Sequence, residues 1–221
     1  MGLWLVQLLR AVGAGKIIAT ASTDDKLALA AAHGATHLVN YSGGSADWVA
    51  RVSEYTADEG GVAAVFDGVG RDTFDGDLEV VARKGTVVSF GNASGVVPPL
   101  TLARLTPKNI KVLRPTLFGY VATRQELADY AAELFDMIRL EKVTVRVHKT
   151  YPLADARQAH MVFLCSPWGG RRLADERGCA RISRGEPLQE SFFSVCRGVG
   201  LTARVVRSIL HRSLIESFAN S

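Results

Sequence analysis

Cysteine is scarce in this chain. The three cysteines of the 221 residues, Cys165, Cys179 and Cys196, all come after residue 161. Residues 1–161 therefore contain no disulfide and no cysteine-based zinc site, and no CxxC or Cys/His spacing for a metal occurs. Three unpaired thiols suit a reducing compartment, so we expect a cytoplasmic protein.

Long apolar runs are also absent, since none reaches the ~20 residues that a membrane-spanning helix needs. Residues 3–12, LWLVQLLRAV, predict a helix, but Gln7 and Arg10 lie inside it and no small-residue cleavage site follows. They therefore do not predict a signal peptide. Apolar residues make up 48% and charged residues 22% of the chain, as is typical of a globular protein. We expect no membrane partner.

Lysine is missing from residues 162–221, which we call the tail. The tail carries nine Arg and five acidic residues, whereas residues 1–161 carry 17 basic and 17 acidic residues, so the tail holds the whole net charge of +4. Arginine without lysine, together with the sudden cysteines, is what a shifted reading frame or a retained intron produces. We expect the tail to be disordered apart from a helix within 199–217, and to stay out of any sheet. The alternative is a binding module whose arginines contact RNA or an acidic partner.

Residues 16–41, KIIATASTDDKLALAAAHGATHLVNY, predict strand, turn, helix and strand. The strands are expected at 16–21 and 37–40, and Gly34 ends the helix between them. Asp24 and Asp25 stand in its first turn, where the helix dipole favours acidic residues. Two strands joined by a crossover helix lie parallel, and such sheets bind ligands beyond the carboxyl ends of their strands.

Small and basic residues follow the first of these strands. A unit that prefers NADH carries Asp or Glu there to bind the ribose hydroxyls, whereas this chain has Ser22. Ser22 leaves room for a 2′-phosphate, Lys26 can reach that phosphate as a point charge, and Tyr41 ends the next strand beside it. This pattern favours NADPH. The alternative is that Ser22 only caps the helix, Lys26 is solvated and Tyr41 is a strand-end aromatic.

The same alternation of helices and strands continues as far as residue 161. Helices are expected at 45–57, 73–83, 123–140 and 152–161, and strands at 62–67, 86–90, 110–114 and 143–151. This order predicts an α/β fold with a doubly wound, mostly parallel sheet.

Glycine-rich loops follow two successive strands of this prediction. Gly68–Gly70 follows the strand 62–67, and Gly91–Gly95 follows the strand 86–90. Glycine lets a cofactor approach the backbone closely, although each loop alone is also an ordinary turn. Two such loops in succession favour cofactor binding.

Several segments in order resemble a known family. They are GLWLVQLLRAVGA, IIATASTDDKLALAAAHGATHLVNY, FDGVGRDTF, ARKGTVVSFGNASG, RPTLFGY and HKTYPLADARQAH. Residues 2–161 resemble the cofactor-binding half of the NADPH-dependent quinone oxidoreductases, the zeta-crystallin-like branch of the medium-chain dehydrogenase/reductase superfamily, and are similar to fungal members.

The resemblance implies a Rossmann domain that binds NADPH for hydride transfer to a quinone or enone without a metal. It assigns no catalytic residue to this half, leaves a homodimer open and does not favour nucleic acid as a partner. The cofactor-binding positions that it implies are Gly2, Ser22, Lys26, Tyr41, Val69, Gly70, Phe90, Gly91, Asn92, Leu117 and Phe118.

The chain departs from this family at both ends. The N-terminal domain, the first Rossmann strand and its Gly-rich phosphate loop are missing, and Gly2 alone would remain of that loop. Residues 1–161 are therefore expected to be a truncated NADP-binding domain that is inactive as a fragment. Because the first strand normally lies in the middle of the sheet, we expect an open slot there, with unpaired backbone groups that favour aggregation.

Overall fold

A six-stranded sheet forms the centre of the computed structural model, which describes residues 2–42, 45–147, 149–165 and 193–197. The strands lie in the order β2-β1-β6-β3-β4-β5. They are β1 (Lys16–Ala21), β2 (His37–Asn40), β3 (Val62–Asp67), β4 (Val81–Ser89), β5 (Lys111–Leu113) and β6 (Phe193–Arg197).

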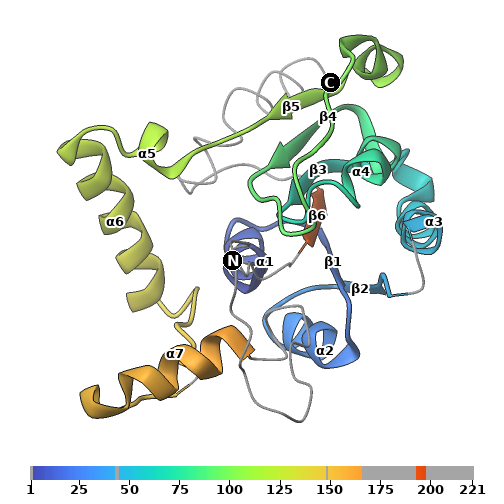
Figure 1. Cartoon of the computed structure of the whole chain (residues 1–221). Coiled ribbons are helices and arrows are strands. Elements are labelled where there is room, and N and C mark those ends of the chain that lie inside the picture. The colour runs from blue at the N-terminus through green and yellow to red at the C-terminus, as the bar shows by residue number, and fades with distance from the viewer. Residues whose placement is uncertain (1, 43–44, 148, 166–192, 198–221) are drawn as a thin grey trace.

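Helices cover both faces of this sheet (Figure 1). The α-helices are α1 (Gly2–Ala11), α2 (Asp24–Ala32), α3 (Ser45–Tyr55), α4 (Phe74–Val80), α5 (Leu117–Tyr120), α6 (Arg124–Arg139) and α7 (Ala156–Cys165). Short 3-10 helices lie at Ala57–Glu59, Leu102–Lys108 and Leu153–Asp155. The predicted doubly wound, mostly parallel α/β sheet is confirmed.

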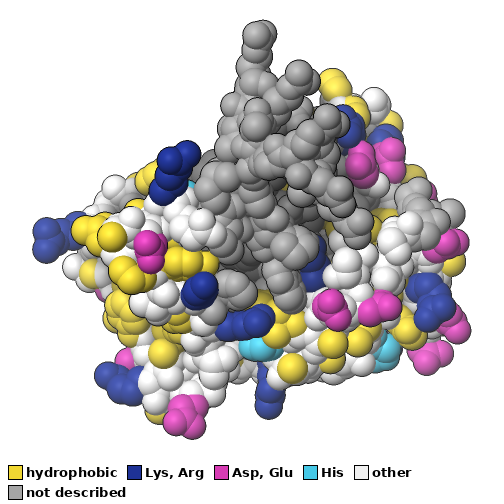
Figure 2. Space-filling model, turned by 60° about the horizontal axis from the view of Figure 1, so that its bottom comes forward, with side chains coloured by type: hydrophobic (Ala, Val, Ile, Leu, Met, Phe, Trp, Pro, Cys, Tyr) yellow, Lys and Arg dark blue, Asp and Glu magenta, His cyan; other side chains and the backbone are white. Residues whose placement is uncertain are grey.

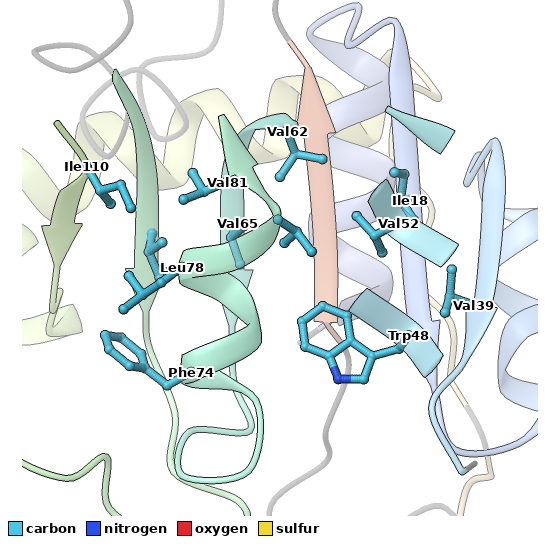
Figure 3. Packing of buried hydrophobic residues seen from close by; sticks show 12 residues of the cluster. Ile18, Val39, Trp48, Val52, Val62, Val65, Phe74, Leu78, Val81 and Ile110 are labelled. Carbon is cyan, nitrogen blue, oxygen red and sulfur yellow. The ribbon is translucent and has the colours of Figure 1, made fainter. Parts of the chain in front are cut away.

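Two apolar cores lie on opposite faces of the sheet because neighbouring residues of a strand point to opposite sides. Ile17 packs with Val6 and Leu9 of α1 on one face. Ile18 packs with Trp48 of α3 on the other, in a cluster that also includes residues of α4 (Figure 3). Helices of both cores therefore hold the strand ends of β1 and β3 in fixed positions.

The middle position of the sheet is filled by a segment of the tail. β6 runs antiparallel between β1 and β3, with Ile18 opposite Val195 on one side and Val65 opposite Val195 on the other. The remaining neighbouring strands pair in parallel. The expectation that the tail stays out of the sheet and leaves the slot open is therefore wrong for residues 193–197. Unpaired N–H and C=O groups on two inner strand edges are costly to bury, and any extended segment can satisfy them.

The expected helix within 199–217 lies outside the described residues. So does most of the tail.

The strand expected at 143–151 is not formed in its described residues, 143–147 and 149–151. A side chain of α1 takes the place of a strand partner. The Gln7 amide nitrogen donates to the Thr144 carbonyl oxygen at 3.3 Å, and the Gln7 amide oxygen accepts from the Thr144 N–H at 2.8 Å. These two bonds satisfy the backbone of Thr144 without a ladder.

The longest helix, α6, begins and ends within a residue of the prediction. Thr123 and Glu126 form a capping box at its start, with Glu126 N–H donating to the Thr123 hydroxyl oxygen at 3.2 Å. No residue of α6 is buried, and Leu127 and Phe135 are exposed. Figure 2 shows hydrophobic side chains gathered on the left of the molecule, the side on which α6 and α7 lie in Figure 1.

Candidate cofactor-binding edge

The carboxyl ends of β1, β2, β3 and β4 all lie at one edge of the sheet, because these strands are parallel where they pair. The loops that leave this edge carry most of the residues singled out in the sequence. We call it the carboxyl edge.

Ser22 and Tyr41 meet at the ends of β1 and β2. The Tyr41 N–H donates to the Ala21 carbonyl oxygen at 3.1 Å, which continues the pairing of β1 with β2 by one residue. The two side chains are hydrogen-bonded to each other. Burial raises the pKa of the Tyr41 phenol above its ordinary value, and the bond to Ser22 only partly opposes this. Tyr41 is therefore a neutral hydroxyl at physiological pH.

Lys26 is buried in the first turns of α2, with 6% of its surface exposed. The view of it as a solvated helix residue is therefore wrong. An ammonium group taken out of water needs polar or anionic surroundings, so its burial beside the end of β1 is a notable feature of this edge.

The N-cap of α2 is Thr23, not Ser22, and its side chain makes no capping bond. The alternative that Ser22 only caps the helix is therefore wrong, since Thr23 holds the N-cap position. Ser22 is left to bond Tyr41, so its hydroxyl belongs to the carboxyl edge.

The carboxylate of Asp24 is held away from this cluster. Asn40 donates its amide N–H to Asp24 at 2.8 Å, and the Asn40 amide oxygen accepts from the N–H and the hydroxyl of Ser42 at 3.0 and 2.7 Å. This arrangement ties the start of α2 to the loop after β2. It also engages an acidic side chain of the first turn of α2 without involving Ser22 or Tyr41.

Asp67, the last residue of β3, organises the loop that follows it. Its side chain is fully buried and accepts hydrogen bonds from Val69 N–H at 2.7 Å, Gly70 N–H at 3.1 Å and the Thr73 hydroxyl at 3.0 Å. The sequence analysis missed this role. The available signal was an acidic residue that ends a buried strand directly before a glycine-rich turn.

A second carboxyl group lies beside Asp67. Asp77 of α4 is also fully buried, and its two oxygens accept no hydrogen bond from the described residues. Burial, followed by the charge of Asp67 and a hydrogen bond to it, raises the pKa of Asp77 well above the ordinary value for Asp. These surroundings favour the protonated form of Asp77, which can donate to Asp67, and no sequence pattern revealed this arrangement.

The two glycine-rich loops contact each other. The Arg71 N–H donates to the Gly95 carbonyl oxygen at 3.1 Å, and the Ser94 N–H donates to the Val69 carbonyl oxygen at 2.8 Å. A Cβ at Gly70 would lie 2.7 Å from the Gly95 oxygen, and Gly70 has a φ of +91°. Glycine is thus required at this position by the approach of one loop to the other.

Arg114 fixes the end of β4. Its guanidinium donates to the Ser89 carbonyl oxygen at 3.0 Å and to the Gly91 carbonyl oxygen at 3.2 Å. Phe90 is half-buried, and its N–H donates to the Asp67 carbonyl oxygen at 2.8 Å. The predicted positions Phe90, Gly91 and Asn92 therefore lie next to the Asp67 loop. Arg114 was not singled out in the sequence, because its partners are up to 25 residues away.

The remaining predicted positions are more dispersed. Gly2 is buried at the start of α1. Leu117 and Phe118 lie on α5 and are 71% and 84% exposed. The described part of the molecule therefore does not enclose these last two side chains.

The part of the chain that the structure describes holds neither a metal site nor a membrane-spanning helix. There, no three or more His, Cys, Asp and Glu side chains gather as a metal site. No helix there is both long enough and apolar enough to cross a membrane.

The sequence of this chain is similar to those of known proteins. The family model of the zinc-binding dehydrogenases matches residues 1–136. Quinone oxidoreductase 1 of Escherichia coli is 41% identical over 165 residues, which cover 73% of this chain and 49% of that protein. The 2-haloacrylate reductase of a Burkholderia species is 33% identical over 162 residues, which cover 72% of this chain and 47% of that protein.

The fold of this chain is also similar to that of a solved structure. The Escherichia coli quinone oxidoreductase complexed with NADPH is 40% identical, covers 73% of this chain and 49% of that one, and superimposes with a TM-score of 0.65. The chain thus spans about half the length of these relatives.

Proposed function

Since the chain belongs to the family of zinc-binding dehydrogenases, we propose that residues 1–161 form an NADPH-binding Rossmann domain of the quinone oxidoreductase type. The resemblance to the quinone oxidoreductases inferred from the sequence is confirmed. In the whole protein, bound NADPH supplies a hydride to a quinone or enone. The similarity to a 2-haloacrylate reductase supports a conjugated acceptor of this kind.

The observation that carries the proposal is the hydrogen bond between Ser22 and Tyr41 at the carboxyl edge, together with the burial of Lys26 in the helix that follows β1. Two neutral hydroxyls are bonded to each other, and an ammonium is buried close by in sequence and on the adjacent helix. A 2′-phosphate is dianionic or nearly so and accepts several hydrogen bonds, which suits these three donors. A ribose hydroxyl would instead need a carboxylate acceptor, and Asn40 already engages Asp24.

The other proposed contacts follow the same edge. Val69 and Gly70 would lie along the adenosine, in a loop that Asp67 keeps rigid. Phe90, Gly91 and Asn92 would face the nicotinamide ribose, and Leu117 and Phe118 the nicotinamide. Gly2 at the start of α1 would offer its N–H to the pyrophosphate, because helix N-termini attract anions.

The proposal is tested by titrating NADPH and NADH into the full chain in a calorimeter. Lys26→Ala should weaken NADPH binding about ten- to a hundredfold and leave NADH binding nearly unchanged, because a charged hydrogen bond contributes roughly 1.5–3 kcal/mol. Lys142→Ala, which removes an exposed lysine elsewhere, is the control and should change neither affinity. Equal losses for both cofactors would place the 2′-phosphate elsewhere.

A further inference from the structure

Among the described residues, the hydrogen-bonded pairing of the two halves of the sheet runs through a strand that comes from far along the chain. On one side lie β2 and β1, and on the other lie β3, β4 and β5. The inner edges of β1 and β3 face each other, and each pairs with β6. Figure 1 shows β6 between them, close to α1.

We propose that the fold depends on a filled strand-acceptor site between the facing edges of β1 and β3, and that residues 193–197 of the same chain, which pair there, are the segment it requires. The site takes a short extended segment that runs antiparallel to both edges. This gives part of the tail a defined structural role that is separate from cofactor binding.

The backbone groups of the acceptor site make an empty slot costly. The pairing covers Lys16–Thr20 of β1 and Ala64–Phe66 of β3. Ile17, Ile18 and Val65 are fully buried or nearly so, as parts of the two apolar cores. Water has poor access to backbone groups among such residues, so a strand must supply the missing donors and acceptors.

The segment FSVCR is suited to this position. It contains no proline or glycine, and Phe and Val are among the residues that favour strands. The 27 residues between α7 and β6 can span up to ~90 Å when extended, which is ample for insertion within one molecule. Insertion from the same chain also needs no second molecule to be brought close.

A disulfide provides a direct test, because the chain already has a cysteine in β6. Ala64 lies directly opposite Cys196 in the register of β3 and β6. Directly opposite residues of antiparallel strands have Cβ atoms ≈ 4.5–5.5 Å apart, close enough for a bond after a small shift. Under mild oxidation, Ala64→Cys in the full chain should give a disulfide between Cys196 and the new cysteine, in monomers on a non-reducing gel.

The matched control is Ala63→Cys, one residue earlier on the same strand. Its side chain points to the opposite face of the sheet, so it should give at least tenfold less of the bond to Cys196. Peptide mapping by mass spectrometry identifies the bonded pairs. Equal yields from both variants, or a bond that forms only between molecules, would overturn the proposal.

A proline in β6 tests whether the strand is needed. Val195→Pro removes an N–H from the middle of a central strand, which such strands do not tolerate. The melting temperature should fall by about 5–10 °C, or the variant should fail to fold. Thr150→Pro, at an exposed position outside the helices and strands, is the control and should melt within about 2 °C of the unmodified chain. If Val195→Pro melts like its control, β6 does not complete the sheet.

Discussion

At the scale of single residues, the most unusual feature is the pair of buried acids, Asp67 and Asp77. Burial raises the pKa of Asp67, and three donors of its own loop oppose this rise, whereas every interaction of Asp77 raises the pKa of that residue further. Two like charges side by side in an apolar interior would be strongly unfavourable. The proton on Asp77 removes that conflict and serves as the fourth donor to Asp67.

Asp77→Asn should therefore stabilise the fold at neutral and alkaline pH. The folded pKa of Asp77 lies above its unfolded value, so its favourable contribution is complete below the unfolded pKa and is lost as pH rises through the folded pKa. The amide keeps a donor toward Asp67 at every pH. The unfolding free energy of Asp77→Asn should exceed that of the unmodified chain by a margin that grows as pH rises from the unfolded to the folded pKa of Asp77 and then levels off.

Asp72→Asn, at an exposed acid in the same stretch, is the control for this prediction. Its stability should follow the unmodified chain within about 0.5 kcal/mol across the pH range. A decrease in stability on Asp77→Asn at pH 8 would mean that the buried carboxyl is ionised in the folded chain.

Gly70 illustrates how a loop depends on one residue without a side chain. Gly70→Ala should cost about 2 kcal/mol or more, because its Cβ would lie 2.7 Å from a backbone oxygen and the residue has a φ of +91°. Gly15→Ala is the matched control, since nothing lies within 4 Å of its Cβ and its φ is unexceptional. Denaturant unfolding of both variants measures the difference, and equal midpoints would show that the two loops can move apart freely.

At the scale of elements, local signals located the first half of the fold well. The bounds of β1, β2 and β3 agree with the prediction to the residue, because short apolar runs are set off there by glycine and hydroxyl residues. The contact between Ser22 and Tyr41 was also predictable, since parallel strands bring their carboxyl ends together, whereas the role of Lys26 stays a prediction. The closeness of the carboxyl ends of β1 and β2 follows from the parallel pairing of these two strands.

Other elements depended on contacts that no local pattern contains. Val143–Val147 has strand-like composition, but Gln7 binds Thr144 across 137 residues and replaces a strand partner. In the sequence, Asp77 resembles an ordinary charged residue on the surface of a helix. Its burial depends on how α4 packs, which the sequence around it does not reveal. β6 could not be assigned to the sheet from the sequence. Its position depends less on its own residues than on the two strand edges, of β1 and β3, between which it pairs.

At the scale of the whole molecule, the sheet depends on pairing between residues that are far apart in the sequence. β6 pairs with β1 across some 175 residues of intervening chain. The two halves of the sheet can therefore join only after almost the whole chain is available. Long-range pairing of this kind slows folding, since loop closure precedes any gain from the contacts.

We expect the full chain to show no enzymatic turnover of quinones with NADPH. Leu117 and Phe118, the residues proposed to line the nicotinamide, are largely exposed, so nothing described holds an acceptor at the ~3–3.5 Å that hydride transfer requires. NADPH oxidation followed at 340 nm with a soluble quinone should stay below ~1 per second. Turnover above that rate, in a sample free of contaminating reductase, would refute this expectation.

The direction of β6 also has a bearing on the origin of this strand. A circular permutation moves a segment from one end of a chain to the other, but it keeps the direction of every strand in the folded sheet. The first strand of a doubly wound sheet runs parallel to its neighbours, whereas β6 runs antiparallel to both of them. Residues 193–197 are therefore not an ancestral first strand moved to the end of the chain. The place of a strand in the middle of a sheet therefore does not by itself reveal the origin of that strand, whereas its direction does limit it.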